Sequence, residues 1–233
     1  MWFEKLKPSL CRGQGANFFR STLFVMGEFG SNDHVSFLIL NRTMDQARAH
    51  VPRTVDSISR GVERLIQHGA KYIVVAHIFP VGCLPVVVVL TLLASTDKAD
   101  YDRNGCLRSV NRLLPQYHNS LLRQRIKVLR DTYLQTMIIP AEYYRPIIAF
   151  LHKPGHFGLN SSTTLLTCCG AGGPPYNFDF STGCGQPGVM VCAHPSEALQ
   201  WDGFHLTEAG HRLIADGWLH GPYADPPILH AAS

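Results

Sequence analysis

The sequence has little charge, and the charge it has is scattered. Only 16% of its 233 residues are Asp, Glu, Lys or Arg, while 45% are hydrophobic, a balance that excludes a chain disordered throughout. No run of five or more like charges occurs, and the formal net charge is only +4. Because a nucleic-acid-binding surface needs clustered basic residues, we expect no nucleic-acid partner. A chain of this length is expected to form one domain over residues 1–233.

Long uninterrupted apolar segments are also missing. The first residues, Met1–Lys7, hold no apolar run of the length of a secretory signal. Residues 73–96 carry no Asp, Glu, Lys or Arg and are long enough for a membrane span, but Pro80, Gly82 and Pro85 interrupt them. We therefore predict a buried strand, a turn and a second apolar segment there, and no transmembrane helix.

The cysteines lack the C-x-x-C pairs of common zinc sites. Seven cysteines are present, so at most three intrachain disulfides can form and one thiol remains. Four of them lie close together: Cys168, Cys169, Cys184 and Cys192. They fall in a segment rich in glycine and proline, residues 159–194, which is typical of a disulfide-stapled loop from an oxidising compartment. A zinc module built on these cysteines and His194 is the weaker alternative, and we predict no metal site.

Short β-prone runs alternate with helical patterns along the chain. Strands are predicted at Ser21–Met26, Lys71–Ala76 and Thr136–Ile139. Hydrophobic residues at helical spacing predict amphipathic helices over residues 51–66 and 107–129, the second kinked or split by Pro115. A short helix over Glu142–Leu151, interrupted near Pro146, comes next. This alternation predicts a mostly parallel sheet covered by helices on both faces.

Thr207 is placed to cap a final helix, which Gly221-Pro222 closes. The inner face of this helix carries Leu213, Ile214 and Trp218. The sequence contains no internal repeat and no clear linker, which again favours a single domain.

Two polar groups of residues could carry chemistry. Asp202 stands three residues before His205, so its carboxylate can accept from Nδ1–H, fix the tautomer and leave Nε2 free as a base. Asn32 lies in the run Gly30–Asp33 after the first predicted strand, where its amide could donate to an oxyanion. Each group also has an ordinary structural explanation: a loop Asp near a surface His, and a turn made of turn-forming residues. Spacing alone does not decide between them.

Four separated motifs together carry a family resemblance. They are, in chain order, Leu23–Asp33, Phe79–Pro85, Cys168–Gly170 and Trp201–Gly210. In this order they resemble blocks of the plant GDSL esterase/lipase family of the SGNH hydrolase superfamily, and the resemblance covers nearly the whole chain. One mild departure is Ser31, which stands where the family often has a second glycine.

The resemblance implies a serine ester hydrolase on a three-layer, flavodoxin-like α/β fold. In such an enzyme His205 would be the general base and later the acid, and Asp202 would orient it. Asn32 would be an oxyanion-hole donor. The implied substrate is a small-molecule ester, such as a carboxylic, lipid or acetyl ester. The resemblance further implies an extracellular location, and its mechanism needs no metal or organic cofactor.

The family's nucleophile block is not found. Its Gly-Asp-Ser turn should lie upstream of Asn32, and the 31 residues before Asn32 do not contain it. Met1–Cys11 resembles the stretch that precedes the third block of the family. We therefore expect an N-terminally truncated domain without its first strand. Such a domain leaves an apolar edge and face exposed on the neighbouring strand.

No other serine is a good candidate for the nucleophile. Ser57 follows an aspartate, but it lies within a predicted helix, with no strand before it and no glycine beside it. No Gly-x-Ser-x-Gly turn occurs in the sequence. We therefore expect a chain impaired in ester hydrolysis, and the alternative is a non-catalytic protein that binds acyl or glycan ligands.

Overall fold

Three short parallel strands organise the part of the chain that the computed structural model describes, which is residues 15–92 and 97–231 with Lys5 and Pro8. The strands β1, β2 and β3 lie side by side in that order and span Leu23–Met26, Tyr72–Ala76 and Met137–Ala141. Val74 at the centre of β2 pairs with Val25 of β1 and Ile139 of β3. The three predicted strands are therefore confirmed, and their carboxyl ends meet at one edge of the sheet.

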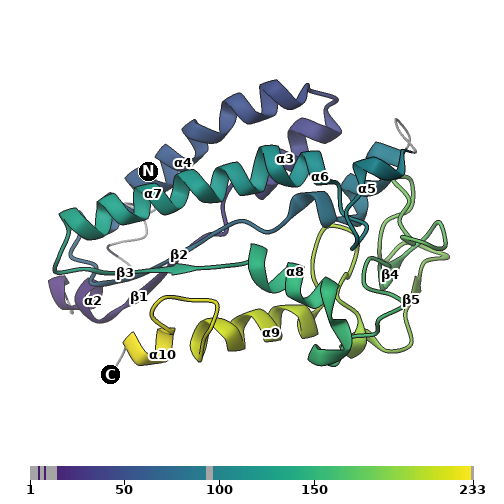
Figure 1. The fold of residues 1–233 in the computed structure, drawn as a ribbon. Coiled ribbons are helices and arrows are strands. Elements are labelled where there is room, and N and C mark those ends of the chain that lie inside the picture. Colours follow the sequence, from purple (N-terminus) through teal and green to yellow (C-terminus); the bar gives the residue numbers. More distant parts are fainter. Residues whose placement is uncertain (1–4, 6–7, 9–14, 93–96, 232–233) are drawn as a thin grey trace.

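Helices cover both faces of this sheet (Figure 1). On one face lie α3 (Ser31–Ile39), α4 (Met44–Gln67) and α7 (Tyr117–Thr132), and on the other lie α8 (Tyr144–His152) and α9 (Glu208–Leu219). This is the three-layer α/β arrangement that the alternation of strands and helices predicts.

The remaining elements are short. Helices α2, α5, α6 and α10 span Gly15–Ser21, Pro85–Leu92, Arg108–Asn111 and Ile228–Ala231. Two strands, β4 (Cys169–Gly170) and β5 (Met190–Val191), pair antiparallel inside the irregular segment predicted for residues 159–194. Residues 73–92 form the rest of β2, a 3-10 turn at Val81–Cys83 and α5, as predicted. No helix among the described residues is long and apolar enough to cross a membrane.

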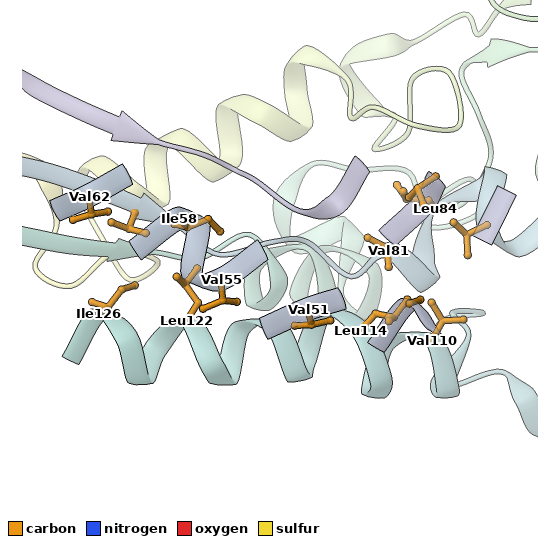
Figure 2. Close-up of a cluster of buried hydrophobic side chains, with 14 of the residues drawn as sticks. Val51, Val55, Ile58, Val62, Val81, Leu84, Val110, Leu114, Leu122 and Ile126 are labelled. Carbon is orange, nitrogen blue, oxygen red and sulfur yellow. The ribbon is translucent and has the colours of Figure 1, made fainter. Parts of the chain in front are cut away.

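The main hydrophobic core lies between α4, α7 and the sheet. Thr43 caps α4 through a capping box, in which its Oγ1 accepts from the Gln46 N–H at 3.2 Å and its own N–H donates to Gln46 Oε1 at 3.0 Å. From this start, apolar residues recur on one face of α4 and meet the apolar face of α7 (Figure 2). The α4 residues in this contact are Val51, Val55, Ile58 and Val62.

Two prolines affect their helices differently. Pro115 interrupts the regular α-helix, as predicted: Arg112–Gln116 form a π-helical segment between α6 and α7. The predicted interruption near Pro146 is wrong, because Pro146 is the third residue of α8, where its missing N–H has no intrahelical partner to lose. Thr207 does cap α9, accepting from the Gly210 N–H, but the short α10 follows, so α9 is not the final helix.

The outer edge of the sheet, at β1, is partly uncovered. Phe24 and Met26 pack against the α4–α7 core, whereas Leu23 and Val25 are 43% and 56% exposed. Val25 pairs with Val74, which is fully buried on the α8–α9 side, so that helical layer covers β2 but leaves β1 open. An exposed apolar face on this strand is what the sequence led us to expect.

Three disulfides hold the loops at the carboxyl edge of the sheet. They are Cys83–Cys106, Cys168–Cys192 and Cys169–Cys184. The last two close the irregular segment, and they confirm the disulfide interpretation of the cysteine cluster. The zinc alternative is wrong, because all four clustered sulfurs are consumed by disulfide bonds, and no group of side chains suited to a metal exists among the described residues.

These pairings predict one free thiol per chain, that of Cys11, which lies outside the described residues. Thiol titration of protein denatured without reductant should give about one thiol, and about seven after reduction. A Cys11→Ser variant is the control, and it should show none before reduction. Three or more thiols in the unreduced wild-type chain would contradict the pairing.

Candidate active site

The loop before α9 brings Asp202 and His205 together. Asp202 Oδ2 lies 2.8 Å from His205 Nδ1, and Asp202 Oδ1 accepts from the backbone N–H groups of Phe204 (3.0 Å) and His205 (2.8 Å). Burial alone would raise the pKa of the Asp202 carboxyl, but these three hydrogen bonds outweigh it and hold that pKa below its ordinary value. The carboxylate is therefore ionised at neutral pH and favours the His205 tautomer that carries its proton on Nδ1.

The disulfide-bonded segment fixes this loop from one side. The backbone N–H groups of Cys168 and Cys169 donate to the carbonyls of Gln200 (3.0 Å) and Trp201 (2.7 Å), directly before Asp202. The Trp201 N–H donates to the His205 carbonyl at 2.8 Å and closes the loop. The His205 side chain remains 72% exposed, so Nε2 is accessible.

Position 203 needs a glycine for two reasons, its backbone conformation and the close approach of Phe178. Its φ of +91° lies in the left-handed region, and an added Cβ would stand 2.3 Å from Phe178 Cδ2. Because the chain turns here with no side chain, Asp202 and His205 come close enough to pair. The motif Trp201–Gly210 indicates the pair in the sequence, but this reason for the glycine appears only in the folded chain.

Asn32 sits in the first turn of α3, immediately after the loop that leaves β1. Gly30 is the N-cap of this helix, with φ +114°, and the His34 N–H donates to the Gly30 carbonyl at 3.0 Å. The Asn32 side chain is exposed, and no described residue forms a hydrogen bond with its amide. The polar run Gly30–Asp33 is thus both a turn and a helix start, and it leaves a free amide donor.

Asn32 and His205 line the same cavity, although they lie near opposite ends of the sequence. The cavity has a volume of about 400 Å³. Its walls are mainly apolar and include Val35, Phe79, Leu84, Tyr143, Ile147 and Phe204. The structure therefore brings together all three predicted site residues, since Asp202 contacts His205 directly.

Glu28 is a cavity residue that the sequence analysis missed. Burial raises the pKa of its carboxyl above the ordinary value, and hydrogen bonds from the Ser31 hydroxyl and N–H offset this only in part. Glu28 lies in the motif Leu23–Asp33, so an acidic residue two positions after the predicted strand was the available signal. His211 of α9 also lines the cavity, and burial together with the neighbouring His205 lowers its pKa.

The described cavity wall carries no serine or threonine hydroxyl and no free thiol, and its one hydroxyl is the phenol of Tyr143. Cys83 is the one sulfur-bearing residue among the described lining residues, and it is bonded to Cys106. Ser57 lies in the middle of α4, where its Oγ donates to the Arg53 carbonyl at 2.9 Å, as expected for an ordinary helical serine. The structure thus does not bring Ser57 to the cavity.

Three buried histidines lie behind the cavity. Burial lowers the pKa of His34 to about 4, and it lowers the pKa values of His77 and His118 to about 3. Neighbouring groups change these pKa values less than burial does. Asp33 raises the pKa of His34 and His50 lowers it. Arg123 lowers the pKa of His77, and the other two imidazoles lower that of His118. All three rings are therefore neutral at neutral pH.

Comparisons with known proteins agree with one another. The family model described as GDSL-like Lipase/Acylhydrolase matches residues 14–218. A GDSL esterase/lipase of Arabidopsis thaliana is 39% identical over 230 residues, which make up 97% of this chain and 57% of that protein. Acetylajmalan esterase 2 of Rauvolfia serpentina is 40% identical over 98% of this chain and 59% of its own length. Sinapine esterase of Brassica napus is 35% identical over 99% and 60%. The chain thus spans a little over half the length of these relatives.

The Asp202–His205 pair can be tested through the imidazole tautomer. An Asp202→Asn variant offers an amide N–H to Nδ1, so neutral His205 should shift its proton to Nε2 and lose its free basic nitrogen. Imidazole ¹⁵N chemical shifts at pH 8 measure the change. The control is Asp216→Asn, which removes the partner of the exposed His220 and should leave His205 unchanged. An unchanged His205 tautomer in Asp202→Asn would contradict the pairing.

The buried histidines predict a loss of stability in mild acid. Their pKa values are lower in the folded chain than the ordinary 6.5, so between pH 6.5 and 4 the unfolded chain binds more protons. The free energy of unfolding should therefore fall as the pH falls from 7 to 5. Each histidine contributes a slope of up to about 1.4 kcal/mol per pH unit.

Urea unfolding at each pH measures this slope. His77→Leu removes one of the three protons and should flatten the slope by about a third. A free energy of unfolding that is independent of pH over this range would refute the burial of neutral histidines.

Proposed function

Because the chain belongs to the family of GDSL-like lipases and acylhydrolases, we propose that the cavity shared by Asn32 and His205 binds a small-molecule carboxylic ester. The observation that carries this proposal is the joint placement of a free amide donor and an accessible imidazole nitrogen on one largely apolar wall. An apolar cavity of this size suits an acyl chain or a small alcohol group.

In this proposal the site residues divide the work of ester cleavage. Asp202 holds His205 with its proton on Nδ1, so Nε2 takes the proton from the attacking hydroxyl and later gives it to the departing alcohol. When the carbonyl carbon becomes tetrahedral, its oxygen carries negative charge, and the Asn32 amide donates to it. A donor of this kind is worth about 3 kcal/mol of transition-state stabilisation. No metal or organic cofactor takes part in these steps.

The attacking group is the part that this cavity does not supply. Among the described lining residues, only Tyr143 carries a hydroxyl, and none carries a free thiol. Burial raises the pKa of the Tyr143 phenol above its ordinary value, which makes it a poorer nucleophile at neutral pH. We therefore infer that the 233-residue chain binds esters and hydrolyses them poorly, since the covalent route needs a nucleophile within reach of His205. The second candidate function, favoured by the same observation, is non-catalytic binding of acyl or glycan ligands.

An extracellular location fits the covalent structure. Three disulfides within one chain are typical of proteins that fold in an oxidising compartment. The related proteins named above are esterases, which favours an ester over an amide as the bond to be cleaved. A role in breaking down lipid or acetyl esters is part of this proposal.

The test uses the purified 233-residue chain and p-nitrophenyl butyrate. We expect isothermal titration to show saturable binding of ethyl butyrate. With p-nitrophenyl butyrate we expect slow release of nitrophenol and no initial burst. A fluorophosphonate probe, which labels activated serines, should leave the chain unmodified. His205→Ala should reduce the residual hydrolysis further, while His220→Ala, at the other exposed His–Asp pair, should not.

Two outcomes would contradict the proposal in different ways. Absence of saturable ester binding would refute the cavity as an ester site. A burst of one nitrophenol per chain, or labelling of a serine by the fluorophosphonate, would show that the chain contains its own nucleophile and is not impaired.

A further inference from the structure

The turn that carries Asn32 is braced from behind by an imidazole of α7. An added Cβ at Gly30 would lie only 2.7 Å from His118 Cε1 and 3.2 Å from His118 Nδ1, so the ring of His118 packs directly on the Gly30 backbone. Thr54 of α4 is the next neighbour, with its Cγ2 at 3.1 Å from the same position. The N-cap residue of α3 therefore packs closely against side chains of α4 and α7.

A buried hydrogen bond ties the next part of the turn to the same imidazole. His34 Nε2 and His118 Nδ1 are 3.3 Å apart, with the rings perpendicular, and the two side chains are 1% and 0% exposed. The His34 N–H also donates to the Gly30 carbonyl. Gly30 and His34 are thus both fixed against His118, and Asn32 lies between them on the opposite, exposed side of the turn.

The α6–α7 region braces the second cavity loop in the same way. Asn119, next to His118, accepts from the Ile78 N–H and donates to the Ile78 carbonyl, each at 2.9 Å. Asn111 accepts from the Gly82 N–H at 2.9 Å. A leucine at either position could not pair with these buried backbone groups, which would then lose their hydrogen bonds. The two asparagines therefore fix the position of the loop relative to α6 and α7.

We propose that His34 and His118 are positioning residues, which aim the Asn32 amide at the negatively charged oxygen of a tetrahedral reaction intermediate. The assignment rests on the proposed function, because Asn32 is the donor only if the cavity binds esters. Because the Asn32 side chain is exposed, the direction in which its amide points depends on the backbone that carries it. The His34–His118 pair fixes that backbone on both sides of Asn32, at Gly30 and at His34. Neither histidine is among the described residues that line the cavity, so neither is placed to contact a ligand bound there.

The experiment compares two ligands that differ in charge and shape at one centre. Ethyl butyrate presents a neutral, planar carbonyl, and ethyl propylphosphonate presents a tetrahedral centre with a negative oxygen. The dissociation constants of both for the 233-residue chain are measured by isothermal titration. A positioning role predicts a selective effect on the phosphonate, whereas loosening of the fold would weaken both ligands.

The variants keep or remove the hydrogen bond between the two imidazoles. His34→Leu removes it at similar volume and should weaken phosphonate binding roughly tenfold, with a change of less than about twofold for the ester. His34→Gln can restore a polar group near the position of Nε2 and should return phosphonate affinity to within about threefold of wild type. His118→Phe, which keeps a ring against Gly30, is a second test should His34→Leu fail to fold.

Asn32→Ala shows whether the effect passes through the amide. If it does, adding His34→Leu to Asn32→Ala should weaken phosphonate binding no further. Equal weakening of both ligands, no effect in either histidine variant, or full additivity with Asn32→Ala would each overturn the positioning role. Failure of the wild-type chain to bind ethyl butyrate would instead refute the proposed function, and this assignment with it.

Discussion

The pairing of β2 with both β1 and β3 is the constraint on which the rest of the structure depends. Parallel pairing turns the carboxyl ends of the three strands to one edge, so each connection must return along a covering helix. Helix α4 makes the first return and α7 the second, and their apolar faces meet above the sheet. The loops that leave β1 and β2 consequently begin side by side, and the cavity forms where they meet the loop before α9.

Two different kinds of anchor hold these loops in place. Buried side chains of α6 and α7 hydrogen-bond to backbone atoms of the loop after β2 and pack on the loop after β1. The loop that bears Asp202 and His205 is held instead by backbone hydrogen bonds, which come from the disulfide-bonded segment and from the Val86 N–H of α5 to the Gly203 carbonyl (3.2 Å). The fold is that of the GDSL/SGNH hydrolases, and its site depends on both anchors.

The sequence predicts the strands, the long helices and the Asp202–His205 pair well, because each rests on local pattern. Short β-prone runs, helical spacing and the motif Trp201–Gly210 are each properties of a few neighbouring residues. The role of Glu28 as a cavity residue and the brace of His118 behind Gly30 are not local: both arise only when residues far apart in the chain are packed together. The predicted interruption at Pro146 is wrong for a different reason: the cost of a proline depends on its place in the helix, and Pro146 lies in the first turn of α8.

The placement of Asn32 and His205 near opposite ends of the chain has a consequence for how the molecule folds. Contacts between distant residues carry the largest loop-closure entropy and form late. The lining residues of the loop after β1, the loop after β2 and α8 all precede Asp202 and His205 in the chain, so the side of the cavity that bears this pair is the last to be made. The cavity can therefore close only after the loop before α9 has packed against the loops that leave β1 and β2, which makes its closure a late step in the folding of this domain.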